Sequence, residues 1–415
     1  MIPLHLLLLY AATAQARIAA DSAGVCGYQN LSAHLSGVSE IFFGKHNLNH
    51  NWTYTSPCFT SPDLEDDEIC VFTDLNFAQG RGISVVTSPK RANVITSKRA
   101  FRDPEFTRGV NQDLVRTIPA VYEIKELPGK GLGVLATRLI RRGELIMANT
   151  ASVMADVKSE EGLSEAKFQA MVSAAAESLP AAHRNAVMRL SIHNANTLTD
   201  AEIASKVMAI NAYSVDDPRD DVADPVKFST IFPELSRINH ACRPNTAYFF
   251  DWETMAQYVY AVVDIPPGEE LSVTYIDGIV SREERLEKLH VSWGFECSCA
   301  QCTLESPQVR ASDARIKQIK ALVDKLESPG RGNPGMAELL ISLYKQEKLW
   351  GSLYEGYTFA AIEYNRVGDP WRAMKNAQLA IEHGIPVGGE NLTDVVEMRS
   401  LAENPWEHWS WNLAA

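Results

Sequence analysis

The sequence has no long apolar run, no excess of positive charge and no low-complexity segment. No stretch reaches the roughly 20 apolar residues that cross a bilayer, which excludes a multi-span membrane protein, and we expect no membrane span. Lysine and arginine total 39 against 52 aspartates and glutamates, a formal net charge of −13. Nucleic-acid binders present a basic face, so no direct nucleic-acid binding is expected. The 24 glycines and 20 prolines are scattered, which excludes collagen-like and globally disordered chains.

What the chain does contain predicts a globular protein with about two or three domains. With 46% hydrophobic and 22% charged residues, its 415 residues can bury a sizeable core. Residues 17–115 carry no motif and are interpreted as an irregular N-terminal region. Strand-like segments with glycine turns start at Val121 and return over residues 246–275, and residues 164–210 between them have a helical period. Residues 313–384 are helical in pattern and include a pair similar to a tetratricopeptide hairpin; the alternative is an ordinary helical domain.

The first 16 residues, MIPLHLLLLYAATAQA, predict a secretory signal peptide. The run from Leu6 to Ala14 suits the apolar core of such a peptide and is too short to cross a membrane. Ala14-Gln15-Ala16 then supplies the small residues of a cleavage site. The alternative is an apolar N-terminus that is not cleaved. The expected location is the secretory pathway or the exterior, and the alternative is the cytoplasm or nucleus.

The seven cysteines cannot all form internal disulfides, because their number is odd. The three nearest the N-terminus are candidates for one disulfide with an odd thiol left over: Cys26, Cys58 and Cys70. Disulfides favour an oxidising compartment, whereas metal-binding thiols are typical of a reducing one. The N-terminal and C-terminal cysteines therefore favour different compartments.

The strongest local signal is a tight cluster of three thiols, Cys297, Cys299 and Cys302, within six residues. Disulfides between such close neighbours would be strained. The same thiols can wrap Zn²⁺, which takes four tetrahedral ligands in structural sites. Cys242, far upstream, is the candidate fourth ligand. The alternative is one disulfide with spare thiols.

Three further segments indicate a function only when they are considered together. They are Gly129–Gly133 (GKGLG), Arg237–Asn245 (RINHACRPN) and Gly268–Tyr275 (GEELSVTY). Taken alone, the first is a glycine turn between strands, and it is no phosphate-binding loop because it lacks the Ser/Thr end and the following helix. The Asn-His pair alone would be a satisfied polar turn, and Tyr275 alone would be a core residue on one face of a strand.

Together and in this order, the motifs resemble those of the SET-domain lysine methyltransferases, most closely the SET-and-MYND branch and its fungal relatives. GKGLG is similar to the family's first glycine motif, RINHACRPN to its NHSCxPN box, GEELSVTY to its tyrosine strand, and GFECSCAQC to its post-SET zinc segment. The resemblance covers about residues 119–303. The chain also departs from the family: no MYND finger follows Ala151, Leu132 stands where a basic residue is frequent, and Ala241 replaces the usual serine.

The resemblance implies an α+β fold with four parts. A β-rich SET domain would span residues 119–277 with a helical insert at about 156–230, followed by a post-SET zinc segment at 278–303. A helical, tetratricopeptide-like C-terminal domain would occupy residues 304–415. The implied function is that of an S-adenosylmethionine-dependent methyltransferase acting on protein lysine.

The resemblance also implies roles for single residues. The residues expected to bind S-adenosylmethionine are Lys130, Gly131, Gly133, Asn239, His240 and Phe295. Tyr275 would be the catalytic residue and would orient the amine. The zinc ligands would be Cys242, Cys297, Cys299 and Cys302. The expected partner is a protein or peptide that offers a lysine, for example on a basic tail, and the protein itself is expected to be a monomer.

Two other functions fit the same residues. One is a catalytically silent interaction module built from the SET core and helical tail, and the other is methylation of a small-molecule amine. An acidic run in the predicted insert would border the substrate groove and attract a basic peptide: Asp216, Asp217, Asp220, Asp221 and Asp224. The alternative is that this run is a solvated loop.

The location can be tested by mapping the N-terminus. We expect the protein, expressed in a secretory host, to begin at Arg17 and to contain one disulfide among its first three cysteines. Mass mapping of tryptic peptides with and without reduction measures both features. Retention of Met1 together with three free thiols would instead place the protein in the cytosol or nucleus.

Overall fold

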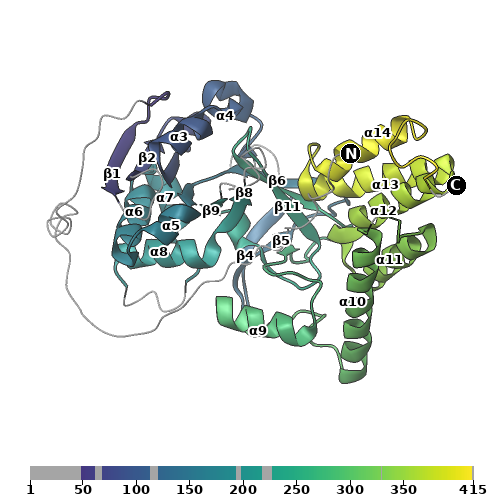
Figure 1. Cartoon of the computed structure of the whole chain (residues 1–415). Coiled ribbons are helices and arrows are strands. Elements are labelled where there is room, and N and C mark those ends of the chain that lie inside the picture. Colours follow the sequence, from purple (N-terminus) through teal and green to yellow (C-terminus); the bar gives the residue numbers. More distant parts are fainter. Residues whose placement is uncertain are drawn as a thin grey trace.

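The computed structural model describes residues 48–60, 68–112, 120–192, 198–216, 227–328 and 330–413. The predicted signal peptide, Cys26 and most of the acidic run lie outside these residues. Figure 1 shows a helix-covered sheet at one end of the molecule, small sheets in the middle, and helices α11 to α14 at the other end. Among the described helices, none combines the length and the apolar character that a membrane span requires.

The largest sheet has six strands in the order β1-β2-β3-β7-β9-β8. They are β1 (Tyr54–Thr60), β2 (Glu68–Asp74), β3 (Ile83–Thr87), β7 (Val153–Asp156), β9 (Lys227–Ile231) and β8 (Tyr213–Asp216). Strands β3 and β7 run parallel, and all other neighbours are antiparallel. The sheet therefore joins the N-terminal region to the two edges of the predicted insert.

The prediction of an irregular region over residues 17–115 is wrong for its described part. Alternate residues of β2 face two different clusters, with Phe72 in one core and Val71 in the other. A strand covered on both faces lacks the apolar–polar alternation that identifies half-buried strands. Strand β2 was therefore not predicted from the sequence. The other short elements of this region are α2 (Phe77–Gly80), α3 (Pro89–Thr96), α4 (Arg99–Arg102) and the 3₁₀ turn η2 (Pro104–Thr107).

One disulfide links this region internally. Cys58 of β1 and Cys70 of β2 are register partners on antiparallel strands, and their sulfur atoms are bonded. The structure thus contains one bridged pair among the N-terminal cysteines, as expected. Cys26 is outside the described residues.

Four helices form the insert between β7 and β8. They are α5 (Val157–Gly162), α6 (Glu165–Glu177), α7 (Ala181–Met188) and α8 (Asp200–Asn211). Helix α6 packs on the large sheet, where Phe168, Met171 and Val172 are buried in one cluster with Val187 of α7. The apolar stripe predicted from the sequence is therefore the face that covers the sheet.

Three small sheets form the middle of the molecule. They are β4 (Tyr122–Leu127) with β5 (Gly131–Ala136), β6 (Leu145–Thr150) with β12 (Ala256–Ala261) and β11 (Thr246–Asp251), and β10 (Asn239–His240) with β13 (Ser272–Val273). The first two pair antiparallel and the last pairs parallel. Residues from both predicted strand regions thus meet in space, and the predicted α+β fold is confirmed.

The C-terminal part is helical, as predicted. Its elements are α9 (Arg282–Trp293), α10 (Ser306–Leu326), α11 (Pro334–Gln346), the turn η6 (Trp350–Ser352), α12 (Leu353–Arg366), α13 (Pro370–Gly388) and α14 (Thr393–Glu403). Helices α10 to α14 bury a core of their own, and α13 also packs on β11 and β12. The helical region extends beyond the predicted residues 313–384 at both ends, since α10 begins at Ser306 and α14 ends at Glu403. Helix α13 itself continues to Gly388 and contains Pro386 in its last turn.

A buried carboxylate ties the helical part to the SET motif. Glu347, which is 2% exposed at the end of α11, accepts from Arg243 at 2.8 Å, Ser312 at 2.7 Å and Arg315 at 2.6 Å. Burial alone would raise the pKa of Glu347, but these hydrogen bonds outweigh it and lower that pKa. The carboxylate is thus charged at neutral pH, and Arg243 is its buried partner.

We expect Glu347→Ala to lower the free energy of unfolding by about 3 to 5 kcal/mol, because it leaves the Arg243 cation buried without its partner. Urea unfolding followed by circular dichroism measures the change. The control Glu287→Ala removes an exposed carboxylate and should stay within about 0.5 kcal/mol of wild type. Since the folded pKa of Glu347 is depressed, its contribution is present above about pH 4.3 and is lost as the pH falls through the folded pKa. Equal stabilities for the two variants would contradict this role.

Candidate functional site

The Asn-His and tyrosine motifs lie side by side. Strands β10 and β13 pair in parallel, with Asn239 opposite Ser272 and His240 opposite Val273. Beyond them, the backbone N–H of Tyr275 donates to Nδ1 of His240 at 3.0 Å. Nδ1 is therefore the acceptor nitrogen, and the proton of the neutral ring is on Nε2. Burial, with help from nearby cations, lowers the pKa of His240 to about 4, so the ring is neutral at physiological pH.

The glycine motif reaches the same place through a carboxylate. Glu270 accepts from Lys130 Nζ at 2.6 Å and from Asn239 Nδ2 at 2.9 Å. Asn239 also donates to the backbone oxygen of Leu132 at 3.3 Å. Three motifs that are far apart in the sequence thus meet at one acidic side chain. Sequence reasoning missed Glu270, although it stands inside the GEEL segment.

Glycine is required at one point of this meeting. A Cβ on Gly133 would lie 2.3 Å from Cδ1 of Leu127 and 2.9 Å from Nδ2 of Asn239. Gly131 has a φ of +70°, which favours glycine for a different reason. The hairpin of β4 and β5 therefore approaches Asn239 as closely as its backbone permits.

Tyr275 is buried beside the histidine. Its ring centroid lies 5.3 Å from that of His240 and 5.5 Å from that of Trp293, and Phe295 lies 6.2 Å from His240. The Tyr275 hydroxyl donates to the backbone oxygen of Ile238 at 2.9 Å. Burial, reinforced by neighbouring tyrosines and Glu270, raises the pKa of Tyr275, so the phenol keeps its proton at neutral pH.

Two more tyrosines that the sequence analysis did not single out complete an aromatic group. Tyr213 of β8 and Tyr248 of β11 lie edge to face with ring centroids 5.1 Å apart, and both interact electrostatically with Tyr275. Burial raises the pKa of Tyr248 to about 12 and that of Tyr213 also. A tyrosine in a strand resembles a core residue, so only its spatial neighbours reveal this group.

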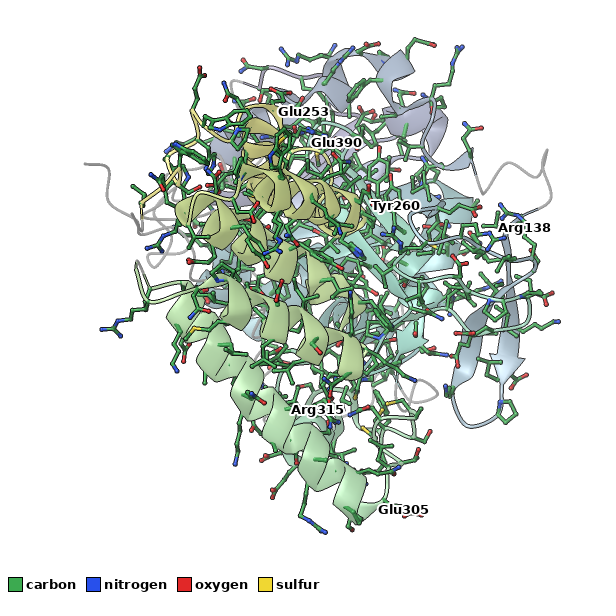
Figure 2. All side chains as sticks on the ribbon, turned by 90° about the vertical axis from the view of Figure 1, so that its right-hand side faces the viewer. Arg138, Glu253, Tyr260, Glu305, Arg315 and Glu390 are labelled. Carbon is green, nitrogen blue, oxygen red and sulfur yellow. A yellow bond between two sulfur atoms is a disulfide. The ribbon has the colours of Figure 1, made fainter. Side chains whose placement is uncertain are left out.

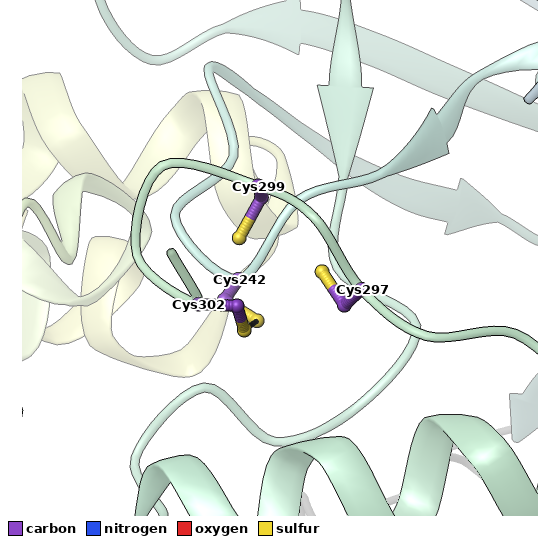
Figure 3. A group of neighbouring side chains, drawn as sticks. All are labelled: Cys242, Cys297, Cys299 and Cys302. Carbon is purple, nitrogen blue, oxygen red and sulfur yellow. Dashed lines mark hydrogen bonds between the residues drawn. The ribbon is translucent and has the colours of Figure 1, made fainter. Parts of the chain in front are cut away.

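The four C-terminal cysteines converge on one point. Figure 3 shows Cys242 reaching the group from one loop and the other three from a second loop, with their sulfur atoms close together. All four sulfur atoms lie within 4.8 Å of one another, and those of Cys242 and Cys302 are 3.4 Å apart. A zinc ion with four sulfur ligands at about 2.3 Å requires sulfur–sulfur separations of about 3.8 Å. The cluster therefore fits a tetrahedral zinc site, and none of its members is in a disulfide.

Hydrogen bonding among the four thiols shifts their pKa values in opposite directions, and it raises the pKa of Cys242. Hydrogen bonds from Cys242, Cys297 and Cys302 lower the pKa of Cys299. His240 joins the cluster to the rest of the site, because its Nε2 lies 3.4 Å from the sulfur of Cys242. In the described residues, the other group of possible metal ligands is Cys58, Glu68 and Cys70, where both thiols are used in the disulfide.

A separate cavity of about 410 Å³ lies where the helical part meets the middle of the molecule. Arg142, Trp350, Tyr357 and His383 are among the residues that line it. None of the residues discussed above borders it. The candidate functional site is therefore the place where the three motifs meet, and this cavity is separate from it.

The sequence is similar to one family model and to several known proteins. Residues 131–276 match the family model of the SET domain. The histone-lysine N-methyltransferase set5 of Schizosaccharomyces pombe is 30% identical over 202 residues, which cover 48% of this chain and 56% of that protein. The N-lysine methyltransferase SMYD2-B of Danio rerio is 35% identical over 100 residues, 22% of this chain and 23% of that protein. The solved SET-domain protein DIM-5 of Neurospora shows 17% identity and a TM-score of 0.20, and covers 40% of this chain and 56% of that chain.

The chain therefore contains a SET domain. Its relatives are lysine methyltransferases of the Set5 and SET-and-MYND types, as the motifs predicted. The chain spans about half the length of the set5 relative and about a quarter of the SMYD2-B relative.

The hydroxyl of Tyr275 has a structural partner, so removing it should cost stability. We expect Tyr275→Phe to lower the free energy of unfolding by about 1 kcal/mol, because the carbonyl of Ile238 loses a buried donor. Thermal and urea unfolding measure the change. Tyr54→Phe, at an exposed position of β1, is the matched control and should have no effect. A Tyr275→Phe protein as stable as wild type would show that water replaces the hydroxyl.

Proposed function

We propose that this protein transfers a methyl group from S-adenosylmethionine to the ε-amino group of a lysine in a protein or peptide. The observation that carries the proposal is the convergence of three SET motifs on Glu270, with Tyr275 directly beside them. Bound S-adenosylmethionine supplies an electrophilic methyl group on a positively charged sulfur. Relatives named histone-lysine N-methyltransferase support a basic histone-like tail as the first substrate to test.

The cofactor would be held where the glycine hairpin meets Asn239. Gly133 leaves no room for a side chain there, so the backbone itself can approach a ligand. Asn239 and His240 offer polar groups, and Lys130 is a half-exposed cation that can contact a carboxylate. Phe295, beside His240, can cover an aromatic ring. These residue types fit a ligand with an amino-acid end and an adenine end.

The aromatic group would prepare the lysine. Only a neutral amine is a nucleophile, and burial among Tyr213, Tyr248 and Tyr275 lowers an amine's pKa because the charged form loses its water. The Tyr275 hydroxyl already donates to Ile238, so its lone pairs are free to accept from the amine. Methyl transfer would release the neutral thioether of the cofactor and leave an extra proton on the lysine nitrogen, which would pass to water. Orientation is the main contribution of the protein.

The four cysteines would hold one structural zinc ion. Loss of a ligand should disorder the segment that carries Phe295, because metal binding and local folding are linked. For location, we propose the secretory route indicated by the signal peptide, and the Cys58–Cys70 disulfide supports it.

Cofactor binding tests the first half of the proposal. Calorimetric titration of the full chain with S-adenosylmethionine should show binding. In Gly133→Ala the dissociation constant should rise about tenfold, or about 1.4 kcal/mol, because the new Cβ displaces Asn239. Gly351→Ala adds a Cβ with no atom within 4 Å and should bind like wild type. A wild-type protein that does not bind would favour the silent interaction module.

Catalysis tests the second half. We expect Tyr275→Phe to lower kcat by about 100-fold, with kcat/KM falling in parallel and cofactor affinity nearly unchanged. Methylation of histone peptides, measured by mass spectrometry, gives both constants, and Tyr54→Phe is the control. Wild-type turnover by Tyr275→Phe would exclude a catalytic hydroxyl. Activity on free amines but on no peptide would identify a small-molecule methyltransferase.

A further inference from the structure

Two arginines bind the backbone of the four-cysteine cluster, and a third is buried on the helix that packs against it. Arg243 donates from Nη1 to the carbonyl oxygen of Cys242 at 2.8 Å. Arg282 donates from Nε to the carbonyl oxygen of Cys302 at 2.8 Å. The third, Arg285, is 1% exposed on α9. Two of the expected metal ligands therefore have a guanidinium bound directly to their backbone.

Arg285 is a buried cation with no carboxylate partner among the described residues. Its Nη1 donates to the backbone oxygen of Val280 at 2.6 Å, and its Nε has no hydrogen-bond partner. It shares the buried face of α9 with Leu289, which packs in one cluster with Cys242, Cys297 and Cys302. Arg285 and Leu289 are four residues apart on α9, so Arg285 lies on the face of the helix that packs against this cluster.

An unpaired buried cation costs several kcal/mol, so a negative charge is expected nearby. Arg243 is balanced by Glu347 at 2.8 Å, and Arg315, which shares that carboxylate, is partly exposed to solvent. This leaves the buried Arg285 and the half-buried Arg282, whose side chains have no ion-pair partner in the described ranges. The carboxylate of Asp313 accepts from the backbone N–H of Arg282 at 3.0 Å. Four thiolates around one Zn²⁺ carry a net charge of −2. The two remaining cations and this centre have equal and opposite charge.

We infer that Arg282 and Arg285 are the counter-cations of a tetrathiolate zinc centre, and that Arg285 sets how tightly the centre holds its metal. The inference rests on the proposed zinc site. Side chains that surround the ligands of a metal typically change its affinity by 10- to 100-fold when they are mutated. A buried positive charge offsets the negative charge of the centre and so slows metal loss.

The inference predicts the direction in which Arg285→Met changes the melting temperature, both with zinc bound and with zinc removed. With zinc bound, Arg285→Met removes a charge that the centre needs, so the protein should lose zinc faster and melt at a lower temperature. With zinc removed, the same change eliminates a buried unpaired cation, so the melting temperature should stay equal or rise. A purely structural arginine would instead lower both melting temperatures alike.

The experiment uses the full-length, zinc-loaded protein. Release of zinc to pyridylazoresorcinol is followed by absorbance, and melting is recorded before and after chelation. We expect release from Arg285→Met to be about 10- to 100-fold faster than from wild type, with Arg285→Lys in between. Lys288→Met, on the exposed face of the same helix, is the matched control and should behave like wild type. Should Arg285→Met not fold, Arg282→Met gives the comparison of zinc release alone, because the half-buried Arg282 carries no expectation for the melting temperature without zinc.

The outcomes separate this inference from the proposals it builds on. A wild-type protein that binds no zinc overturns the metal site and this inference together, while cofactor binding is judged on its own. A zinc-containing wild type with unchanged release in Arg285→Met overturns only the role of the arginine. A fall in both melting temperatures also overturns it. Figure 2 labels Arg315, the arginine of α10 that shares the carboxylate of Glu347 with Arg243.

Discussion

The two-residue parallel pairing of β10 with β13 is the constraint on which the site depends. It joins segments more than 30 residues apart and fixes Asn239 and His240 against Tyr275. Cys242, two residues after His240, is thereby placed at the centre of the cysteine cluster. The residues proposed for cofactor, amine and metal thus lie on or next to this one short pair of strands. A shift of register here would displace all three functions together.

Two carboxylates, the partly buried Glu270 and the buried Glu347, organise the structure around this pairing. Glu270 gathers Lys130 and Asn239 on one side, and Glu347 gathers Arg243 and the C-terminal helices on the other. Each carboxylate binds side chains from segments that are distant in sequence and so fixes how these segments lie relative to one another. Such interactions are directional, unlike apolar packing, so they can specify geometry that the hydrophobic core alone would leave loose.

Much of the site could be predicted from sequence because its residues stand in compact motifs. The spacing of Cys297, Cys299 and Cys302 restricts their chemistry to metal binding or disulfides, and an ordered set of motifs identified the SET domain. Strand β2 could not be predicted, because it is covered on both faces and its alternation is lost. Tyr213 and Tyr248 were missed for another reason: their importance arises from proximity across the fold, which no local pattern records.

Arg243 has a consequence for how the molecule opens. Its guanidinium donates to the backbone oxygens of Cys242 and Gly278 and to the side chain of Glu347. It therefore connects the cysteine cluster, the segment that follows Tyr275 and the end of α11. Local fluctuations in any one of these segments must break bonds to the other two. Their amide hydrogens should therefore exchange with solvent as one cooperative unit, which includes the end of α11 as well as the segments next to His240 and Tyr275.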